Sequence, residues 1–160
     1  MTGFPIPSVR GTEIKDAPDH QDAELLLRLY DLRREPLLRE SRRWLSAEFW
    51  PAGAEELLAL TRPDDPHNAP FRQVAGYWEM AYGLARHGIM NPDFLAEFAG
   101  EGLFLFAKIR PWLAELRQRS SPLAFRNTEW IATQCETGRT LLAYYRERVE
   151  RALAARRSPG

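Results

Sequence analysis

The stretch from residue 71 to residue 119, FRQVAGYWEMAYGLARHGIMNPDFLAEFAGEGLFLFAKIRPWLAELRQR, decides the fold because it contains both a helix end and a helix start. Gly88 lies where a helix commonly ends in a left-handed C′ residue, and the next residue can fold back on the last turn in a Schellman motif. Asn91 can then cap a new helix that begins with Pro92. The stretch therefore predicts a tight helical hairpin with aromatic flanks.

Helical periodicity also precedes the hairpin. Asp19 is a candidate N-cap for a helix over residues 23–35. Pro36 lacks an amide hydrogen, so it either opens a second helix or kinks one long helix. A short helix is expected over residues 54–60, and Asn68 is expected to cap the first helix of the hairpin.

The segments after the hairpin have the same character. Gly100 and Gly102 should break its second arm in two, and residues 126–157 can form one long helix capped by Asn127 or Thr128. Its apolar seam recurs at intervals of three and four and consists of Ile131, Cys135, Gly138, Leu142, Tyr145, Val149 and Leu153.

These patterns predict an all-α single domain. No segment alternates with period two, so no β-sheet is expected. We expect a bundle of five to seven helices with a central helical hairpin and a long C-terminal helix. Residues 1–18 are rich in Pro and Gly without helical period, so they should form an extended or flexible arm. The bundle then covers residues 19–157.

Composition limits the possible functions. The formal net charge is zero, so no global field attracts nucleic acid or an anionic membrane. The chain has two lysines, Lys15 and Lys108, against 20 arginines, which fits a GC-rich genome. Cys135 is the single cysteine, so an intramolecular disulfide and a Cys₂ or Cys₄ zinc site are excluded. No apolar run is long enough to span a membrane, and a cytoplasmic protein is expected.

Several segments together resemble an uncharacterised bacterial all-helical domain family of unknown function. They are LLLRLYDLRREPLLRESRRWL (25–45), YWEMAYGLARHGIMNPDFLAEFAG (77–100), W-L-x-x-L-R (112–117) and FRNTEWIA (125–132). The resemblance covers residues 22–135. It implies the fold and a bacterial origin, and it supplies no activity.

Glu79 is the ionisable residue that stands out, because helical spacing places it at the edge of an apolar face. In one interpretation it is a general acid or a ligand-binding carboxylate, in an aromatic pocket with Tyr82, Arg110 and Trp112. In the other it is structural, either paired with Arg110, Arg117 or Arg126 or bonded to a tryptophan N–H. We favour the structural interpretation.

Other catalytic and metal-binding patterns are missing from the sequence. The three histidines match neither HExxH nor a Glu-x-x-His pair, and His67 is interpreted as a solvated loop residue. There is no G-x-S-x-G elbow and no phosphate-binding glycine loop. We expect no metal, no cofactor and no catalytic residue.

The densest basic cluster is a weak candidate for nucleic-acid binding. Arg39, Arg42 and Arg43 lie close together at helical spacing, but Glu35 and Glu40 dilute their charge. A solvated face with ion pairs one turn apart explains the same pattern.

The leading hypothesis is a non-enzymatic protein-interaction or regulatory module, with a protein partner or self-association through the C-terminal helix. The alternative is a small-ligand-binding or enzymatic bundle with a pocket around Glu79. A nucleic-acid binder using the arginine cluster comes third.

Overall fold

A computed structural model describes residues 13–158, and every regular element in that range is helical. A 3₁₀ turn, η1 (Arg110–Trp112), joins two of the α-helices. The α-helices are α1 (His20–Leu32), α2 (Pro36–Ala47), α3 (Ala54–Ala59), α4 (Asn68–Arg86), α5 (Pro92–Phe98), α6 (Gly100–Ile109), α7 (Leu113–Arg119), α8 (Arg126–Gln134) and α9 (Glu136–Arg157). The all-α prediction is confirmed, but the helices outnumber the expected five to seven, in part because residues 126–157, expected to be one helix, form α8 and α9.

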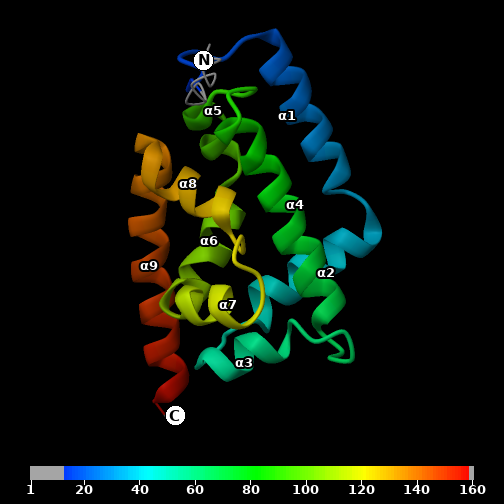
Figure 1. The fold of residues 1–160 in the computed structure, drawn as a ribbon, viewed down its shortest axis with the longest axis vertical. Helices are drawn as coiled ribbons and strands as arrows, with labels where there is room; N and C mark the ends of the chain where they lie inside the picture. Colours follow the sequence, from blue (N-terminus) through cyan, green and yellow to red (C-terminus); the bar gives the residue numbers. More distant parts are fainter. Residues whose placement is uncertain (1–12, 159–160) are drawn as a thin grey trace, which may run out of the picture.

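The helices form a bundle around α4 and α6 (Figure 1). Helix α4 packs against α2 and α8, and α6 packs against α9. The short α3 and α7 contact each other at the lower end of the view, while α1 flanks α4 on the side opposite α9. None of these helices is both long and apolar enough to cross a bilayer.

The turn between α4 and α5 is the one that the sequence predicts. Gly88 has a φ of 73°, in the left-handed region. The Ile89 amide donates to the Leu84 carbonyl at 2.9 Å and the Gly88 amide to Ala85 at 3.0 Å, which is the bond pair of a Schellman motif. The Asn91 side chain accepts from the Phe94 amide at 2.8 Å and so caps α5.

The predicted starts of the earlier helices are partly correct. Asp19 caps α1 by accepting from the Asp22 amide at 3.0 Å, and Pro36 opens α2 as its first residue. Asn68 does not cap α4, because its side chain turns back to donate to the Leu60 carbonyl at 2.7 Å. His67 occupies the cap position instead, without a side-chain cap bond.

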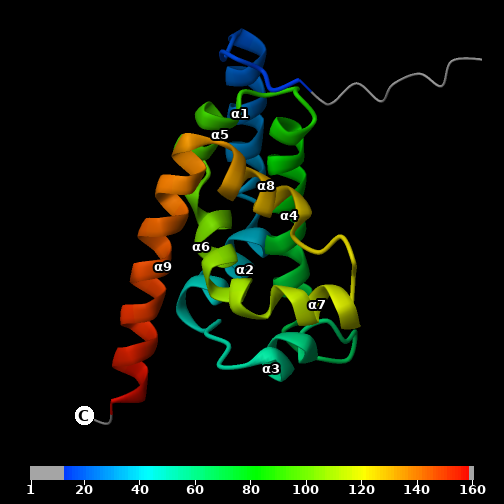
Figure 2. The ribbon, with the colours of Figure 1, turned by 60° about the vertical axis from the view of Figure 1, so that its left-hand side comes forward.

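The long C-terminal helix is confirmed as α9, but it begins at Glu136, and residues 126–134, expected to be part of it, form the separate helix α8. The chain is extended at Cys135, with φ −117° and ψ 153°, and this residue separates α8 from α9 (Figure 2). The Cys135 sulfur accepts from the Gly138 amide at 3.3 Å and caps α9. Burial raises the pKa of this thiol to about 11, so it stays protonated at neutral pH.

The apolar seam of α9 packs inside the chain. Leu142 and Val149 are buried, and Tyr145 contacts Phe104 of α6 with ring centroids 5.5 Å apart. The seam therefore packs within the protein, and self-association through the C-terminal helix stays a prediction.

The beginning of the described chain binds the hairpin. The Lys15 amine lies 2.8 Å from Asp19 and 2.5 Å from the fully buried Asp22, and the Lys15 carbonyl accepts from the Asn91 side chain at 2.8 Å. Residues 13–18 thus hold the hairpin turn. The rest of the predicted arm, residues 1–12, lies outside the described residues.

Candidate functional site

Two adjacent hollows lie at the lower end of the molecule, between the end of α2 and the start of α4. The first has a volume of about 440 Å³ and the second about 300 Å³. Both are lined by Trp44, Glu48 and His67, so we describe them together as the Trp44–His67 groove. The first hollow also touches Leu37, Glu40, Ser41, Arg43, Pro66 and Pro70, and the second touches Phe49, Trp50, Pro51, Glu56, Ala59 and Leu60.

The loop between α3 and α4 forms one wall of the Trp44–His67 groove. Its prolines limit the backbone, and the Asp65 side chain accepts from the His67 amide at 2.8 Å. The bond from Asn68 to the Leu60 carbonyl closes the loop at its base. These local bonds hold the His67 ring over α2.

An aromatic stack divides the groove into its two hollows. The rings of Trp44 and His67 lie 5.2 Å apart at 15° to each other, and Trp44 also contacts Phe49 at 5.4 Å. Trp44 is half-buried and His67 is exposed. The stack therefore presents an aromatic surface to solvent while one edge is anchored in the core.

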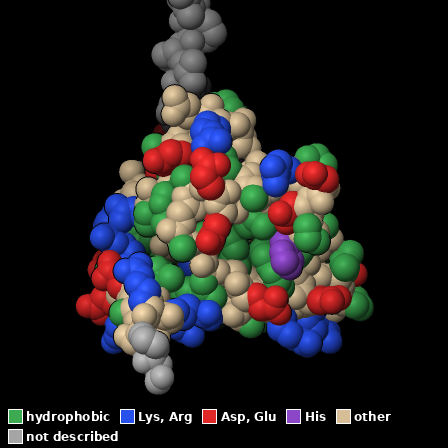
Figure 3. Space-filling view, turned by 90° about the horizontal axis from the view of Figure 1, so that it is seen from below, with side chains coloured by type: hydrophobic (Ala, Val, Ile, Leu, Met, Phe, Trp, Pro, Cys, Tyr) green, Lys and Arg blue, Asp and Glu red, His purple; other side chains and the backbone are tan. Residues whose placement is uncertain are grey.

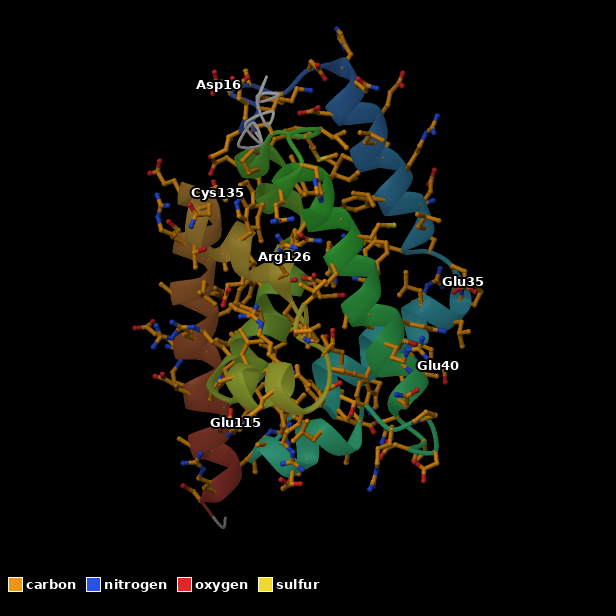
Figure 4. The ribbon with its side chains drawn as sticks, in the orientation of Figure 1. Asp16, Glu35, Glu40, Glu115, Arg126 and Cys135 are labelled. Carbon is orange, nitrogen blue, oxygen red and sulfur yellow. The ribbon has the colours of Figure 1, made fainter. Side chains whose placement is uncertain are left out.

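Carboxylates predominate on the rim of the groove. Glu40, Glu48 and Glu56 line the two hollows together with one cationic side chain, Arg43, and the Arg156 guanidinium lies 4.7 Å from the ring centre of the lining residue Trp50. The Glu56 side chain accepts from the Ala52 amide at 2.9 Å, whereas Glu40, Glu48 and Arg43 form no ion pair within residues 13–158. Figure 3 shows a histidine among apolar side chains at this end, with acidic groups around it, and Figure 4 labels Glu40 on α2.

Lys108 supports the Trp50 wall of the groove from inside. Its ammonium nitrogen lies 3.8 Å from the Trp50 ring centre and 4.3 Å from that of Phe104, and it donates to the Leu45 carbonyl at 2.7 Å. Burial, with Arg156 and Arg148 nearby, lowers the pKa of Lys108 to about 7. Because a lysine ammonium needs hydrogen-bond acceptors when buried, this side chain ties α6 to the end of α2.

Glu79 binds the start of α8, and the expected arginine pair is wrong. Its carboxylate accepts from the Asn127 amide at 3.1 Å, from the Thr128 amide at 2.7 Å and from the Thr128 hydroxyl at 2.6 Å. These amides are orphan donors of a helix N-terminus, where a negative charge is favoured. Glu79 is thus a cap supplied by another helix. The candidate partner Arg126, labelled in Figure 4, begins α8.

Two of the three remaining expected partners of Glu79 bind elsewhere. Arg117 pairs with Glu129 at 3.3 Å. The Trp78 ring nitrogen donates to Glu101 at 3.1 Å rather than to Glu79.

The structure does not gather the four predicted ligand-binding residues into one pocket. Tyr82 is fully buried and donates to the Ala99 carbonyl, and burial raises its pKa well above the usual value. Its ring packs over Gly102, where a Cβ atom would overlap both Tyr82 and Trp78. Arg110 and Trp112 instead line a separate cavity beside α9.

The predicted arginine cluster is divided. Arg42 turns inward and binds Glu101 through two nitrogens, with distances from 2.8 to 3.0 Å. Arg39 donates to the Arg34 carbonyl at 3.0 Å, and Arg43 lies at the groove between carboxylates. A continuous cationic face for nucleic acid is therefore not formed by these three residues.

Sequence reasoning missed the groove because its parts come from distant segments. His67 is exposed, as expected of a loop residue, but its place in the sequence gives no sign that its ring stacks on Trp44. Lys108 was noted as a rare lysine, and the signal for its burial was its place in the apolar run LFLFAKI. Within residues 13–158, no group of three or more His, Cys, Asp and Glu side chains could hold a metal ion.

Comparison with known proteins supplies the family. A family described as "Domain of unknown function (DUF4760)" matches residues 18–135, and the chain belongs to it. The match confirms the resemblance to an uncharacterised family and ends at the break between α8 and α9. No curated protein and no solved structure matches the chain.

Proposed function

We propose that this protein is a protein-interaction module whose Trp44–His67 groove binds a basic segment of a partner protein. The observation that carries the proposal is the exposed aromatic stack between two hollows, with unpaired carboxylates on the rim. Aromatic surface supplies contact area at low conformational cost, as in many interfaces.

The charges around the groove favour a positively charged partner segment. Glu40 and Glu48 are exposed and unpaired in residues 13–158, with Arg43 as the counter-charge, so the rim has an excess of negative charge. Arg and Lys side chains would meet these carboxylates and could stack on Trp44. Leu or Pro side chains of the same segment would fit the apolar walls formed by Leu37 and Pro70.

The test uses an array of synthetic 12-residue peptides that vary in Arg and Lys content and in Leu and Pro content. We expect peptides combining basic and apolar residues to bind, and we expect Glu40→Gln with Glu48→Gln to weaken binding several-fold. Added salt should weaken it as well. The matched control is Glu147→Gln, an exposed carboxylate on α9 that does not line the groove.

Two results would reject the groove as a site for basic segments. One is equal binding of acidic and basic peptides. The other is binding of basic peptides that the double Gln variant leaves unchanged.

The same proposal places this module in a bacterial cytoplasm. Its support is the arginine-rich composition and the single buried thiol, which suits a reducing compartment. Fractionation of the native cells tests this placement.

A further inference from the structure

A second cavity lies between α6, η1 and α9, away from the Trp44–His67 groove. Its volume is about 430 Å³, within the range of roughly 300–1,000 Å³ that is typical of small-molecule sites. Figure 2 shows α9 running beside α6, so that the cavity lies along a helix–helix seam. Its lining includes Lys108, whose amine is already bonded to the Leu45 carbonyl, and the other residues used in the argument are Arg110, Trp112, Arg146, Val149, Glu150 and Leu153.

The cavity has an apolar wall. Val149 is buried, and Trp112 and Leu153 are half-buried against the core. These side chains come from η1 and from successive turns of α9, so they line the wall along the helix axis. Such a surface would accept the apolar body of a ligand.

The mouth of the cavity carries an excess of positive charge. Arg110 and Arg146 are exposed, and neither forms an ion pair in residues 13–158. Glu150 is the one acidic side chain among the lining residues. Two guanidinium groups beside an apolar wall match an anion that has an apolar body, since guanidinium binds carboxylate through paired hydrogen bonds.

We propose that this cavity binds a small organic carboxylate. Arg110 and Arg146 hold the carboxylate group, and Trp112 and Leu153 contact the apolar body. The two arginines set the preference for an anion. An inorganic anion would leave the apolar wall exposed to water, so it should bind more weakly than a carboxylate with an apolar body. The inference is independent of partner binding at the Trp44–His67 groove.

Isothermal titration of the full chain with octanoate tests the proposal. We expect octanoate to bind with one site per chain. Arg110→Gln and Arg146→Gln should each raise the dissociation constant about tenfold, equivalent to 1.4 kcal/mol. Leu153→Trp should fill the cavity and abolish binding. The matched control is Arg151→Gln, an exposed arginine of α9 outside the cavity, which should bind as the parent does.

Thermal melting of each variant shows that it folds, and Arg110 and Arg146 are exposed, so the Gln variants should melt as the parent does. Octanol is a neutral probe that tests the need for a negative charge. Inorganic phosphate is an anionic probe that tests the need for an apolar body. Octanol binding as tightly as octanoate would show an apolar cavity without anion preference and overturn the proposal. Phosphate binding as tightly as octanoate would overturn it too, as would no octanoate binding or binding unaffected by the arginine variants.

Discussion

The α4–α5 turn and the α8–α9 junction are both sharp breaks between helices, but they are specified differently. At the first, Gly88 and Asn91 supply the left-handed residue and the cap within four positions of each other. At the second, the residue pattern suits one helix, and carboxylates of the hairpin bind amides at the starts of both α8 and α9.

The hairpin supplies carboxylates to both helices of the second region. Glu79 of α4 caps α8, and Asp93 of α5 accepts from the Thr137 amide at the start of α9 at 2.8 Å. A helix start buried in a bundle must satisfy its free amides, and a side chain from another helix does this as well as a local one. The comparison shows that the sequence reveals a cap when it is local and of a usual residue type, as at Asn91, and does not reveal a cap from another helix, such as Glu79, or a thiol cap, such as Cys135.

The largest effect is expected at the second region, from Gly138→Ala. A Cβ atom at Gly138 would overlap the backbone carbonyl oxygen of Ile131, so α8 and α9 must move apart. We expect a loss of about 3 kcal/mol or more in the free energy of unfolding, measured in urea. The control is Gly76→Ala, where a Cβ meets nothing within 4 Å; it should gain up to about 1 kcal/mol. Similar unfolding free energies for the two variants would contradict the close approach of α8 and α9 at Gly138.

Removal of the distant cap should come next. Glu79→Leu leaves the amides of Asn127 and Thr128 without their acceptor, and we expect a cost of about 2–3 kcal/mol by urea unfolding. Glu79→Gln keeps one acceptor oxygen and should cost less. A Leu variant as stable as the parent would mean that α8 does not depend on α4 for its start.

At the end of α2, a third cap comes from a distant residue, and its contribution to stability should depend on pH. Lys108 donates to the Leu45 carbonyl, and its pKa in the folded protein, about 7, lies below the ordinary value of 10.5. Between these values the unfolded chain binds more protons, so stability should rise with pH. Relative to Lys108→Met, the parent should gain about 2 kcal/mol from pH 7 to pH 9. Urea unfolding of the parent and of Lys108→Met at pH 7 and at pH 9 measures this gain. A difference in unfolding free energy between the two proteins that is the same at both pH values would contradict the lowered pKa.

The smallest effect is expected at the locally specified turn. Gly88→Val places a β-branched residue at a φ of 73°, and we expect a cost of about 1–2 kcal/mol. Gly88→Asn is the control and should cost less, because Asn tolerates the left-handed region. Equal melting temperatures for the parent and the Val variant would contradict backbone strain at residue 88 in this turn.

Much of the fold could be predicted because many of its signals are local. Gly88, Asn91, Asp19 and Pro36 each act within a few residues, so the hairpin and the first helix starts were correct. Asn68 shows the limit: its type is typical of a cap, but the Leu60 carbonyl lies close enough to take its amide. The candidate sites were less predictable, since pockets join segments that are distant in sequence. Arg110 and Trp112 do share a cavity, whereas Glu79 and Tyr82 are held by bonds inside the fold.

The sequence by itself determined the helical class, the hairpin turn and the absence of a cysteine pair, because periodicity, left-handed glycine and residue identity need no partner. Only the tertiary structure decided the break at Cys135, the partners of Glu79 and Arg42, the burial of Lys108 and the stacking of His67 on Trp44. The physical reason is that charged and polar groups take whichever partner the packed helices bring near, and that partner is set by three-dimensional distance rather than by spacing along the chain.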